Sequence, residues 1–338
     1  MGFVRSYVRN LASVALGRQP LRPLLFSYYI THRCNLNCRY CCDGDGKRFK
    51  EDPVPELATA DVKRLLGILR RAADTLDITG GEPLMRDDLE EILAEARRLG
   101  LRTVLNTKGL GLQRRPEIAR LADTIVLSVD TLDAGALAAL IGRPREQAED
   151  VLAALDFLLQ RRGDEGFKLV LSAVATPDNL DDVRRVLHFA LEQGLGFHLS
   201  PEIVGTQVNP VLRGNVAYQA LVAEVRGEKR RRRGVLGLDD YLCGITTFAP
   251  FACHPLLMPV IRPDGRMYYP CLESKQAEIN VLETGDYFAA LAQARKLRGE
   301  VPRCGACCHI FCHMALSMLQ RHPLGALGEL RHWSASHA

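Results

Sequence analysis

The chain has 338 residues, which is more than one small domain needs and enough for a large α/β domain with an appendage. Hydrophobic residues make up 47% of it and charged residues 25%, an ordinary composition for a folded soluble protein. The net charge of +4 is too small to indicate nucleic-acid binding by itself, and no apolar run approaches the roughly 20 residues that span a bilayer. We therefore expect neither a nucleic-acid partner nor a transmembrane segment.

Residues 1–23 are predicted to form a basic amphipathic segment. Apolar side chains recur at helical spacing from Phe3 to Val14, and no acidic residue precedes Asp43. The four arginines of the segment are Arg5, Arg9, Arg18 and Arg22. Such a helix can lie on an anionic membrane, so peripheral membrane contact stays open. Docking of the helix against the main domain is the favoured interpretation.

Between residues 24 and 200, predicted strands alternate with predicted helices. The strands are apolar runs that cover residues 24–31, 75–79, 101–107, 124–130, 167–176 and 196–200. The helices carry apolar side chains at three- and four-residue spacing, and they cover residues 59–72, 87–100, 116–121, 145–163 and 179–194. Thr59 is expected to cap the first helix, and Gly100, Gly163 and Gly194 are expected to end three others.

This alternation implies a parallel sheet with right-handed crossovers. The sheet could form a full barrel, a partial barrel or an open doubly wound sheet. All three place their active sites at the carboxyl ends of the strands. The stretch CNLNCRYCC, residues 34–42, directly follows the first strand and is therefore expected at that edge.

After residue 200 the alternation stops. The chain is then predicted to be mostly loop with one helix near 215–226, and the basic run at 228–234 is interpreted as solvated surface. Residues 258–271 predict a β-hairpin that turns on Pro263-Asp264-Gly265. A further helix is expected at 286–298.

Eleven cysteines fall into groups, with none between Cys42 and Cys243. A secreted disulfide framework belongs to short chains with little core, and the sequence lacks a cleavable signal peptide, so metal or iron–sulfur binding is favoured. Cys34, Cys38 and Cys41 form C-x3-C-x2-C. Three thiolates on one tight loop can bind three irons of a [4Fe–4S] cluster, whose usual complement is four ligands. The remaining iron would stay open, as in a catalytic metal site.

These features resemble the radical S-adenosylmethionine (SAM) superfamily. The cysteine motif follows the first strand, Tyr40 precedes the third cysteine, and Gly80-Gly81-Glu82-Pro83 after the second strand matches the family's GGEP segment. The resemblance implies a partial (β/α)6 TIM-like barrel over residues 24–200. It also implies that SAM binds the open iron through its amino and carboxylate groups. Reductive cleavage would then give methionine and a 5′-deoxyadenosyl radical, which abstracts a hydrogen atom from the substrate.

The resemblance also places cofactor contacts at the ends of the later strands. The candidates are Gly80, Gly81, Glu82, Pro83, Asn106, Ser128 and Ser172. Two glycines allow backbone groups to approach a ligand closely, and Glu82 could accept a hydrogen bond from the cofactor's amino group. Residues Asn106-Thr107-Lys108-Gly109 depart from the family's Thr-Asn-Gly. His198 could face the substrate, and a structural histidine is an equal alternative.

A second set of cysteines resembles the twitch and SPASM extensions, which hold auxiliary [4Fe–4S] clusters. Its members are Cys253, Cys271, Cys304 and Cys307. We expect one auxiliary cluster that transfers electrons, although four thiolates could hold zinc instead. Whether Cys308 or Cys312 replaces one of the ligands stays open. Cys243 is expected in the core, and Cys42 is expected not to be a ligand.

The sequence therefore predicts a radical SAM enzyme. The expected domains are residues 1–23 as the basic segment, 24–200 as the barrel, 201–239 as a linker, 240–320 as a cysteine-rich α+β domain and 321–338 as a tail. The substrate is expected to be a small metabolite or sugar, or a ribosomal peptide, and a lipid-linked substrate also stays open. A flavodoxin or ferredoxin is the implied electron donor, in a reducing cytoplasm. The alternative is a non-catalytic iron–sulfur or zinc protein for electron transfer or sensing.

Overall fold

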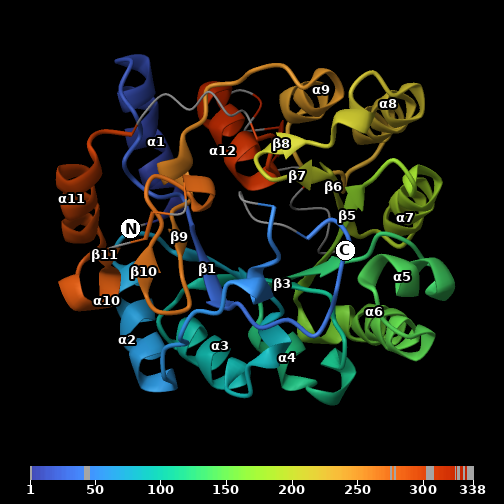
Figure 1. The fold of residues 1–338 in the computed structure, drawn as a ribbon, viewed down its shortest axis with the longest axis horizontal. Coiled ribbons are helices and arrows are strands. Elements are labelled where there is room, and N and C mark those ends of the chain that lie inside the picture. Colours follow the sequence, from blue (N-terminus) through green and yellow to red (C-terminus); the bar gives the residue numbers. More distant parts are fainter. Residues whose placement is uncertain are drawn as a thin grey trace.

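The computed structural model describes residues 2–41, 46–274, 276–277, 279–301, 308–323, 325, 328–329 and 332. Its central element is a mostly parallel sheet that curves through the molecule, with helices around it (Figure 1). Within these residues, nine strands form the sheet in the order β11-β10-β9-β1-β2-β3-β4-β5-β6. The chain thus has the α/β fold with a parallel sheet that its sequence predicts.

Six parallel strands run in chain order, each beside the one before it. They are β1 (Phe26–Thr31), β2 (Thr75–Gly80), β3 (Arg102–Thr107), β4 (Thr124–Ser128), β5 (Lys168–Ala175) and β6 (Gly196–Pro201). Because the order from β1 to β6 has no reversal, the doubly wound alternative is excluded. β6 does not pair with β1 in the described sheet, so these strands form an open, partial barrel.

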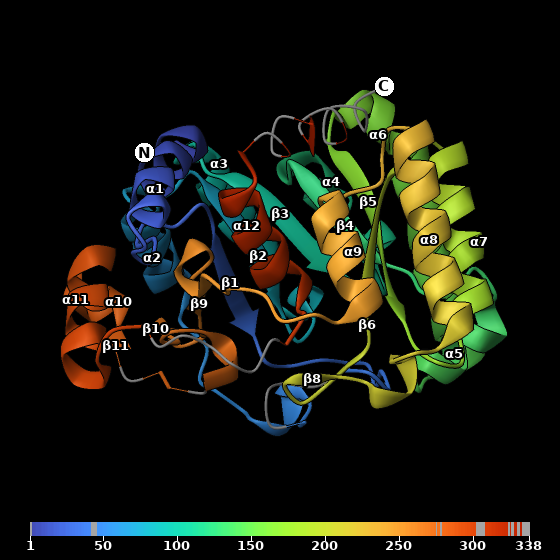
Figure 2. The same cartoon turned by 90° about the horizontal axis from the view of Figure 1, so that it is seen from above.

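Helices follow these strands and cover the sheet (Figures 1 and 2). Those of the described residues are α1 (Phe3–Ala15), α2 (Thr59–Arg70), α3 (Leu89–Arg98), α4 (Glu117–Leu121), α5 (Ala134–Ile141), α6 (Arg145–Glu165), α7 (Leu180–Glu192), α8 (Val216–Arg231), α9 (Asp239–Thr247), α10 (Val281–Thr284), α11 (Tyr287–Arg298) and α12 (Phe311–Arg321). The apolar faces of α2, α3 and α7 are buried, as their sequence periodicity predicts. Burial of each large apolar side chain contributes about 1.5–3 kcal/mol, so this layer stabilises the framework of the site.

Two predicted helix caps differ from those in the structure, at Thr59 and at Gly163. Thr59 is the first residue of α2, and its hydroxyl donates to Asp88 (2.7 Å) while Ala58 occupies the cap position. The capping role predicted for Thr59 is therefore wrong. α6 continues through Gly163 and ends at Gly166, whose φ of 73° closes the helix in the left-handed region.

The strands after residue 250 extend the main sheet. β9 (Val260–Ile261) pairs in parallel with β1 and antiparallel with β10 (Arg266–Met267), and β11 (Ile279–Asn280) lies at the edge. Figure 1 shows this orange segment beside the blue β1, which comes from the other end of the chain. The predicted hairpin at Pro263-Asp264-Gly265 is confirmed.

Residues 201–239 contain a two-stranded ribbon and α8. The ribbon pairs β7 (Ile203–Val204) with β8 (Gln207–Val208). α8 is longer than the predicted helix and includes part of the basic run, whose residues 230–233 are exposed, as expected of a solvated surface.

α12 and α9 contact each other beside the sheet (Figure 2). Phe311 lies at the start of α12, and its ring centroid is 3.7 Å from that of His198 on β6. The same ring meets Tyr241 of α9 edge-on, with 5.0 Å between the ring centroids. Neither helix is among the predicted elements. In the part of the chain that the structure describes, no helix combines the length and apolar character needed to cross a bilayer.

Candidate active site

The cysteine motif occupies the loop after β1, at the carboxyl ends of the parallel strands. The Asn37 amide donates to the Ile141 carbonyl (2.8 Å), which ties the loop to α5. Within the loop, the Cys41 amide donates to the Cys38 carbonyl (3.3 Å). Cys34, Cys38 and Cys41 are all partly buried. The three predicted ligands thus lie on one loop, which backbone hydrogen bonds fix at the carboxyl ends of the strands, as predicted.

The Gly-Gly segment at the end of β2 lies directly against the start of this loop. The Gly81 amide donates to the Thr31 carbonyl (2.8 Å), and the Glu82 amide donates to the Arg33 carbonyl (2.9 Å). A Cβ atom on Gly80 would lie 2.2 Å from the Thr31 carbonyl oxygen, and one on Gly81 would lie 2.2 Å from the Arg33 carbonyl oxygen. Both glycines are therefore required for the packing of the two motifs, a reason that the sequence interpretation did not include.

Glu82 is buried, and its carboxylate forms hydrogen bonds within the protein. One oxygen accepts from the Leu84 amide (3.1 Å) and the Thr107 hydroxyl (2.6 Å), and the other accepts from the Lys108 amide (2.9 Å). Burial raises the pKa of Glu82, and these hydrogen bonds oppose the rise. Glu82 thus links the end of β2 to the end of β3, a structural role beside the cofactor contact predicted for it. Pro83 begins the short turn that follows.

Lys108 is the centre of a buried polar network beside the cysteine loop. Its ammonium donates to Asp130 (2.6 Å), to the Tyr40 hydroxyl (3.0 Å) and to the Ser128 hydroxyl (3.4 Å). The Tyr40 hydroxyl also donates to Asp130 (2.5 Å), whose second oxygen accepts from the Val174 amide (2.9 Å). The side chains of Lys108 and Asp130 are only 5% and 0% exposed. The network joins the ends of β3, β4 and β5 to the cysteine loop.

The charge of Lys108 also reaches the cysteines. Burial disfavours the ammonium, but Asp130 and the other acidic neighbours outweigh this effect, so the pKa of Lys108 is raised. Burial raises the pKa of Cys38, and the Lys108 ammonium opposes that rise. Burial likewise raises the pKa of Cys34. Because the thiolate is the form that binds metal, Lys108 favours the ligating form of Cys38.

Sequence reasoning missed the role of Lys108. The available signal was the departure of Asn106-Thr107-Lys108-Gly109 from the family pattern. A lysine directly after a buried strand is uncommon inside a protein unless an acidic partner is present. The structure supplies this partner as Asp130, which follows the next strand.

The three cysteines lie on one loop, where each thiolate could bind one iron of a cluster. Across the residues with a described position, no three His, Cys, Asp or Glu side chains converge on a point that could hold one metal ion. A cubane needs no such convergence, because each thiolate binds a different iron. One loop that carries all three thiols, with a lysine charge beside it, fits an anionic iron–sulfur cluster.

The remaining predicted contacts are polar side chains on adjacent strands. Asn106 donates to the carboxylate of Asp77, and burial raises the pKa of Asp77 to about 6. The Ser172 hydroxyl lies 3.0 Å from Nδ1 of His198. Burial lowers the pKa of His198 to about 3, so its imidazole is neutral near pH 7. Asn106, Ser128 and Ser172 thus have partners within the chain, and their contact with a cofactor stays a prediction.

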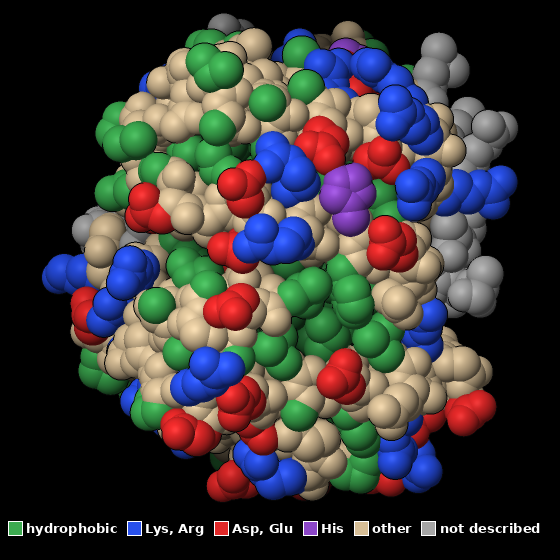
Figure 3. Space-filling view, turned by 90° about the vertical axis from the view of Figure 1, so that its right-hand side faces the viewer, with side chains coloured by type: hydrophobic (Ala, Val, Ile, Leu, Met, Phe, Trp, Pro, Cys, Tyr) green, Lys and Arg blue, Asp and Glu red, His purple; other side chains and the backbone are tan. Residues whose placement is uncertain are grey.

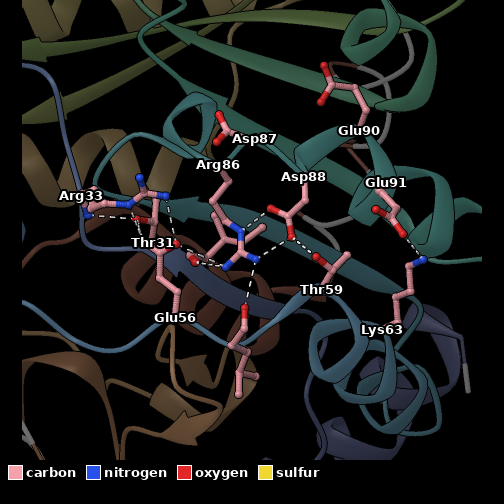
Figure 4. Close-up of polar contacts among 12 residues, drawn as sticks. Thr31, Arg33, Glu56, Thr59, Lys63, Arg86, Asp87, Asp88, Glu90 and Glu91 are labelled. Carbon is pink, nitrogen blue, oxygen red and sulfur yellow. Dashed lines mark hydrogen bonds and ion pairs between the residues drawn. The ribbon is translucent and has the colours of Figure 1, made fainter.

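A second polar network anchors the first residues of the loop (Figure 4). Arg33 donates to both oxygens of Glu56 (2.7 and 3.0 Å), which also accepts from the Thr31 hydroxyl (2.5 Å). Beside this group, the buried Arg86 donates twice to Asp88 (2.8 and 2.7 Å). These charged residues surround the backbone contact between the two motifs, so they stabilise the framework of the site. Their role was not predicted from the sequence.

Asp88→Asn is expected to lower the free energy of unfolding at neutral pH by about 2 kcal/mol. The hydrogen bonds from Arg86 lower the pKa of Asp88 to about 2, so the native state favours the carboxylate. This contribution is present above about pH 4 and is lost as the pH falls toward about 2. Urea unfolding at several pH values measures it, and the wild type and variant should converge in acid.

The control is Glu95→Gln, which removes the charge of an i,i+3 pair with Arg98, 68% exposed. Exposed pairs contribute about 0–1 kcal/mol, so this variant should stay close to the wild type. Equal losses in the two variants would contradict the assigned role of Asp88.

The predicted auxiliary ligands are only partly described. Cys304 and Cys307 lie outside the described residues, as does Cys42, while Cys253 precedes the short 3-10 turn before β9 and Cys271 follows β10. Burial raises the pKa of Cys312 to about 12. Cys243 is exposed on α9, so its predicted core position is wrong. The auxiliary site stays a prediction.

A cavity opens beside the cysteine loop, with a volume of about 350 Å³. Tyr40 and Cys41 line it from the loop, and Arg48, Glu51 and Glu202 add charged groups. Its position places a bound molecule next to the third cysteine. This cavity is the candidate substrate site.

Comparison with known proteins fits this geometry. Residues 28–190 match the family model of the Radical SAM superfamily. This match spans a little under half of the chain, so residues 28–190 are similar to a radical SAM domain. GTP 3′,8-cyclase from Mycobacterium marinum is 32% identical over 228 residues, which cover 64% of this chain and 55% of that protein. The chain spans about half the length of the curated relatives it matches. The match to the radical SAM family model and these relatives together identify the chain as an enzyme, whose exact reaction stays open.

Solved structures share the fold of this chain. SuiB of Streptococcus suis bound to SAM has a TM-score of 0.63 and 17% identity, covering 90% of this chain and 76% of that chain. The protein anSMEcpe with bound AdoMet and the Cp18Cys peptide has a TM-score of 0.59 and 14% identity, covering 91% of this chain and 95% of that chain. At these identities the likeness establishes the fold alone. The family implies a [4Fe–4S] cluster and SAM as cofactors.

Proposed function

We propose that this enzyme cleaves SAM reductively and uses the 5′-deoxyadenosyl radical to abstract a hydrogen atom from a small, charged metabolite. The backbone contact of Gly81 and Glu82 with Thr31 and Arg33, which lead directly into the Cys34–Cys41 loop, carries the proposal. It joins the two segments that the resemblance assigns to the cluster and to the cofactor, through hydrogen bonds of 2.8 and 2.9 Å. A protein that only carries electrons has no need for such a cofactor segment.

In this proposal, Cys34, Cys38 and Cys41 hold the [4Fe–4S] cluster and leave one iron open for SAM. When bound, the cluster supplies the electron that cleaves the cofactor. Residues of this chain position the reacting groups, and the candidates for cofactor contact are Gly80, Gly81, Glu82, Pro83, Asn106, Ser128 and Ser172. The interior position of Lys108 and Asp130 keeps a fixed ion pair beside this centre.

The cavity beside Cys41 favours a small substrate. Its volume of about 350 Å³ lies at the lower end of the range for small-molecule sites, and its lining includes Arg48, Glu51 and Glu202. A charged metabolite or sugar derivative suits this lining, in keeping with the relatives named for a reaction of GTP. A ribosomal peptide is the alternative, because both SuiB and anSMEcpe were solved with a bound peptide.

The test is formation of 5′-deoxyadenosine after anaerobic reconstitution with iron, sulfide, dithionite and SAM. The wild type should form it above the level of a Cys34→Ala variant, because loss of one thiolate removes a cluster ligand. GTP and short peptides are then added separately, and the substrate class that accelerates turnover is identified by the increase. Equal 5′-deoxyadenosine from the wild type and Cys34→Ala would contradict the proposal and favour a non-catalytic iron–sulfur or zinc protein.

We also propose one auxiliary [4Fe–4S] cluster on Cys253, Cys271, Cys304 and Cys307, for electron transfer. The triple variant Cys34/Cys38/Cys41→Ala should then fall from about eight to about four irons per chain, with four irons per cubane. Iron and zinc analysis of the reconstituted protein measures this directly. Complete loss of iron, or zinc in place of the remaining iron, would overturn the second cluster.

The electron donor in this proposal is a flavodoxin or ferredoxin. Clusters with an open iron are sensitive to oxygen, so we expect the enzyme to work in a reducing cytoplasm. The proposed division of labour assigns the radical chemistry to residues 24–200 and the auxiliary cluster to residues 240–320.

A further inference from the structure

One face of α1 is docked on the main body. The Tyr7 hydroxyl donates to the Leu319 carbonyl (2.9 Å), and Gln320 donates to the Tyr7 carbonyl (3.2 Å), which fastens the helix to α12. Asn10 is buried and donates to the Arg22 carbonyl (2.8 Å). The interpretation of α1 as a docked helix is therefore confirmed.

The opposite face of α1 is apolar and exposed. Val4, Val8 and Leu16 are 72%, 57% and 69% exposed, and the four-residue spacing of Val4 and Val8 places them on one side of the helix. Among the described residues they make up three of the seven large hydrophobic side chains that are exposed. A fourth, Leu297, lies on α11, the helix beside α1 in Figures 1 and 2. Exposed apolar side chains thus gather along these two helices.

This face is also strongly basic. Arg5 and Arg9 follow Val4 and Val8 by one residue and so border the apolar side chains. The other basic residues of the two segments are Arg18, Arg22, Arg295, Lys296 and Arg298. No acidic residue occurs before Asp43 in the sequence. The side of the molecule drawn in Figure 3, which carries α5, α7 and α8, instead mixes acidic and basic side chains.

A cavity of about 750 Å³ lies between α1 and α11. Arg9, Arg18, Arg22 and Arg295 line it, together with a single acidic residue, Glu300. Arg295 is paired with Glu300 (3.0 Å), and among the described residues the lining carries four basic side chains and one acidic one. A guanidinium carries five N–H donors, so an arginine with one partner still has donors to offer to a phosphate.

We propose that this face, formed by α1, residues 18–22 and α11, docks on the surface of an anionic phospholipid bilayer. The exposed apolar side chains of α1 enter the interfacial region, and the arginine-lined cavity receives a phosphate headgroup. The combination of apolar and basic groups favours a lipid surface over a small soluble anion, because such an anion makes no contact with the valine and leucine side chains.

Docking in this way leaves the candidate active site accessible. The Phe3 amide at the start of α1 donates to Asp74 (3.2 Å), and Asp74 directly precedes β2. α1 therefore reaches the amino end of β2, whereas the cysteine loop lies at the carboxyl end of β1, its parallel neighbour. A substrate and an electron donor could both reach the site while the enzyme lies on the membrane.

The test is sedimentation of the full reconstituted chain with phosphatidylcholine vesicles that contain or lack phosphatidylglycerol. Binding should require the anionic lipid and should weaken as salt is added. The double variants Val4→Asp/Val8→Asp and Arg9→Glu/Arg18→Glu should each lower the vesicle partition coefficient by about tenfold or more. All these residues lie outside the catalytic machinery, so 5′-deoxyadenosine formation without vesicles should not change.

The matched control is Val216→Asp/Arg230→Glu on α8, where Val216 is 78% exposed and Arg230 is also exposed. It should bind vesicles as the wild type does. Equal binding to both vesicle types, or equal loss in the α8 control, would overturn the proposal. So would thermal stabilisation by inorganic phosphate without any vesicle binding, since the cavity would then be a site for a soluble anion.

Discussion

Gly81→Ala is expected to prevent cluster loading. The new Cβ would lie 2.2 Å from the Arg33 carbonyl oxygen and 2.7 Å from that of His32, and both are backbone atoms directly before Cys34. Relief requires the end of β2 to move away from the cysteine loop, which breaks the two backbone hydrogen bonds between them. Iron content and 5′-deoxyadenosine formation should fall to the level of Cys34→Ala, and the free energy of unfolding should fall by about 2–4 kcal/mol.

Gly67→Ala is the matched control. Gly67 lies inside α2, and a Cβ there meets no atom within 4 Å. Alanine is the better helix former, so this variant should load its cluster normally and gain up to about 1 kcal/mol of stability. Normal iron content and activity in Gly81→Ala would show that the contact between the two motifs is dispensable.

Lys108→Met should destabilise the protein by about 3–5 kcal/mol. It leaves Asp130, which is fully buried, without its cationic partner, while only the Tyr40 hydroxyl and the Val174 amide still donate to it. Because the pKa of Lys108 is raised, its contribution is present below about pH 10 and is lost as the pH rises through the native value. Anaerobic urea unfolding of the protein measures the change.

The same variant should alter the cluster in a way that a merely structural residue would not. Lys108 places a positive charge near Cys38, so its loss should shift the reduction potential of the cluster to more negative values. Addition of Asp130→Asn should restore part of the lost stability, because the unpaired charge is then removed. Lys63→Met is the control, since Lys63 pairs with Glu91 at 2.5 Å on the surface and should contribute less than about 1 kcal/mol. Similar losses from the two lysines would contradict the role given to Lys108.

The sequence predicts the barrel well because each of its strands and helices can be recognised from a short stretch of residues. Each strand from β1 to β6 is a short apolar run between turn residues, and each following helix shows three- and four-residue spacing. The same locality explains the placement of Cys34, Cys38 and Cys41, which follow a recognisable strand. Contacts between residues far apart in the sequence cannot be predicted from a short stretch of it. The pairing of β1 with β9 and the docking of Phe311 on His198 belong to this class.

The sequence predicts the motifs of the candidate site but not the contacts that hold these motifs in place. The GGEP segment is visible in the sequence, but the reason for its glycines depends on how close the backbone of Arg33 lies. Lys108 and Asp130 are separated along the chain and meet because β3 and β4 end side by side. At α6, two glycines compete to end the helix, and only the backbone conformation at Gly166 decides between them.

The pairing of β1 with β9 affects the order in which the enzyme is assembled during synthesis. Ser27 of β1 is paired with Val260 of β9. One edge of β1 therefore has no partner strand until the ribosome has released the segment around residue 260. Until then the strand that carries the cysteine loop is an exposed edge, open to wrong pairings. Closure of so long a loop is a late event in folding. The strand that presents the cluster ligands is therefore among the first to be translated and among the last to be completed, so the apoprotein would be ready for iron–sulfur delivery only after most of the chain has emerged.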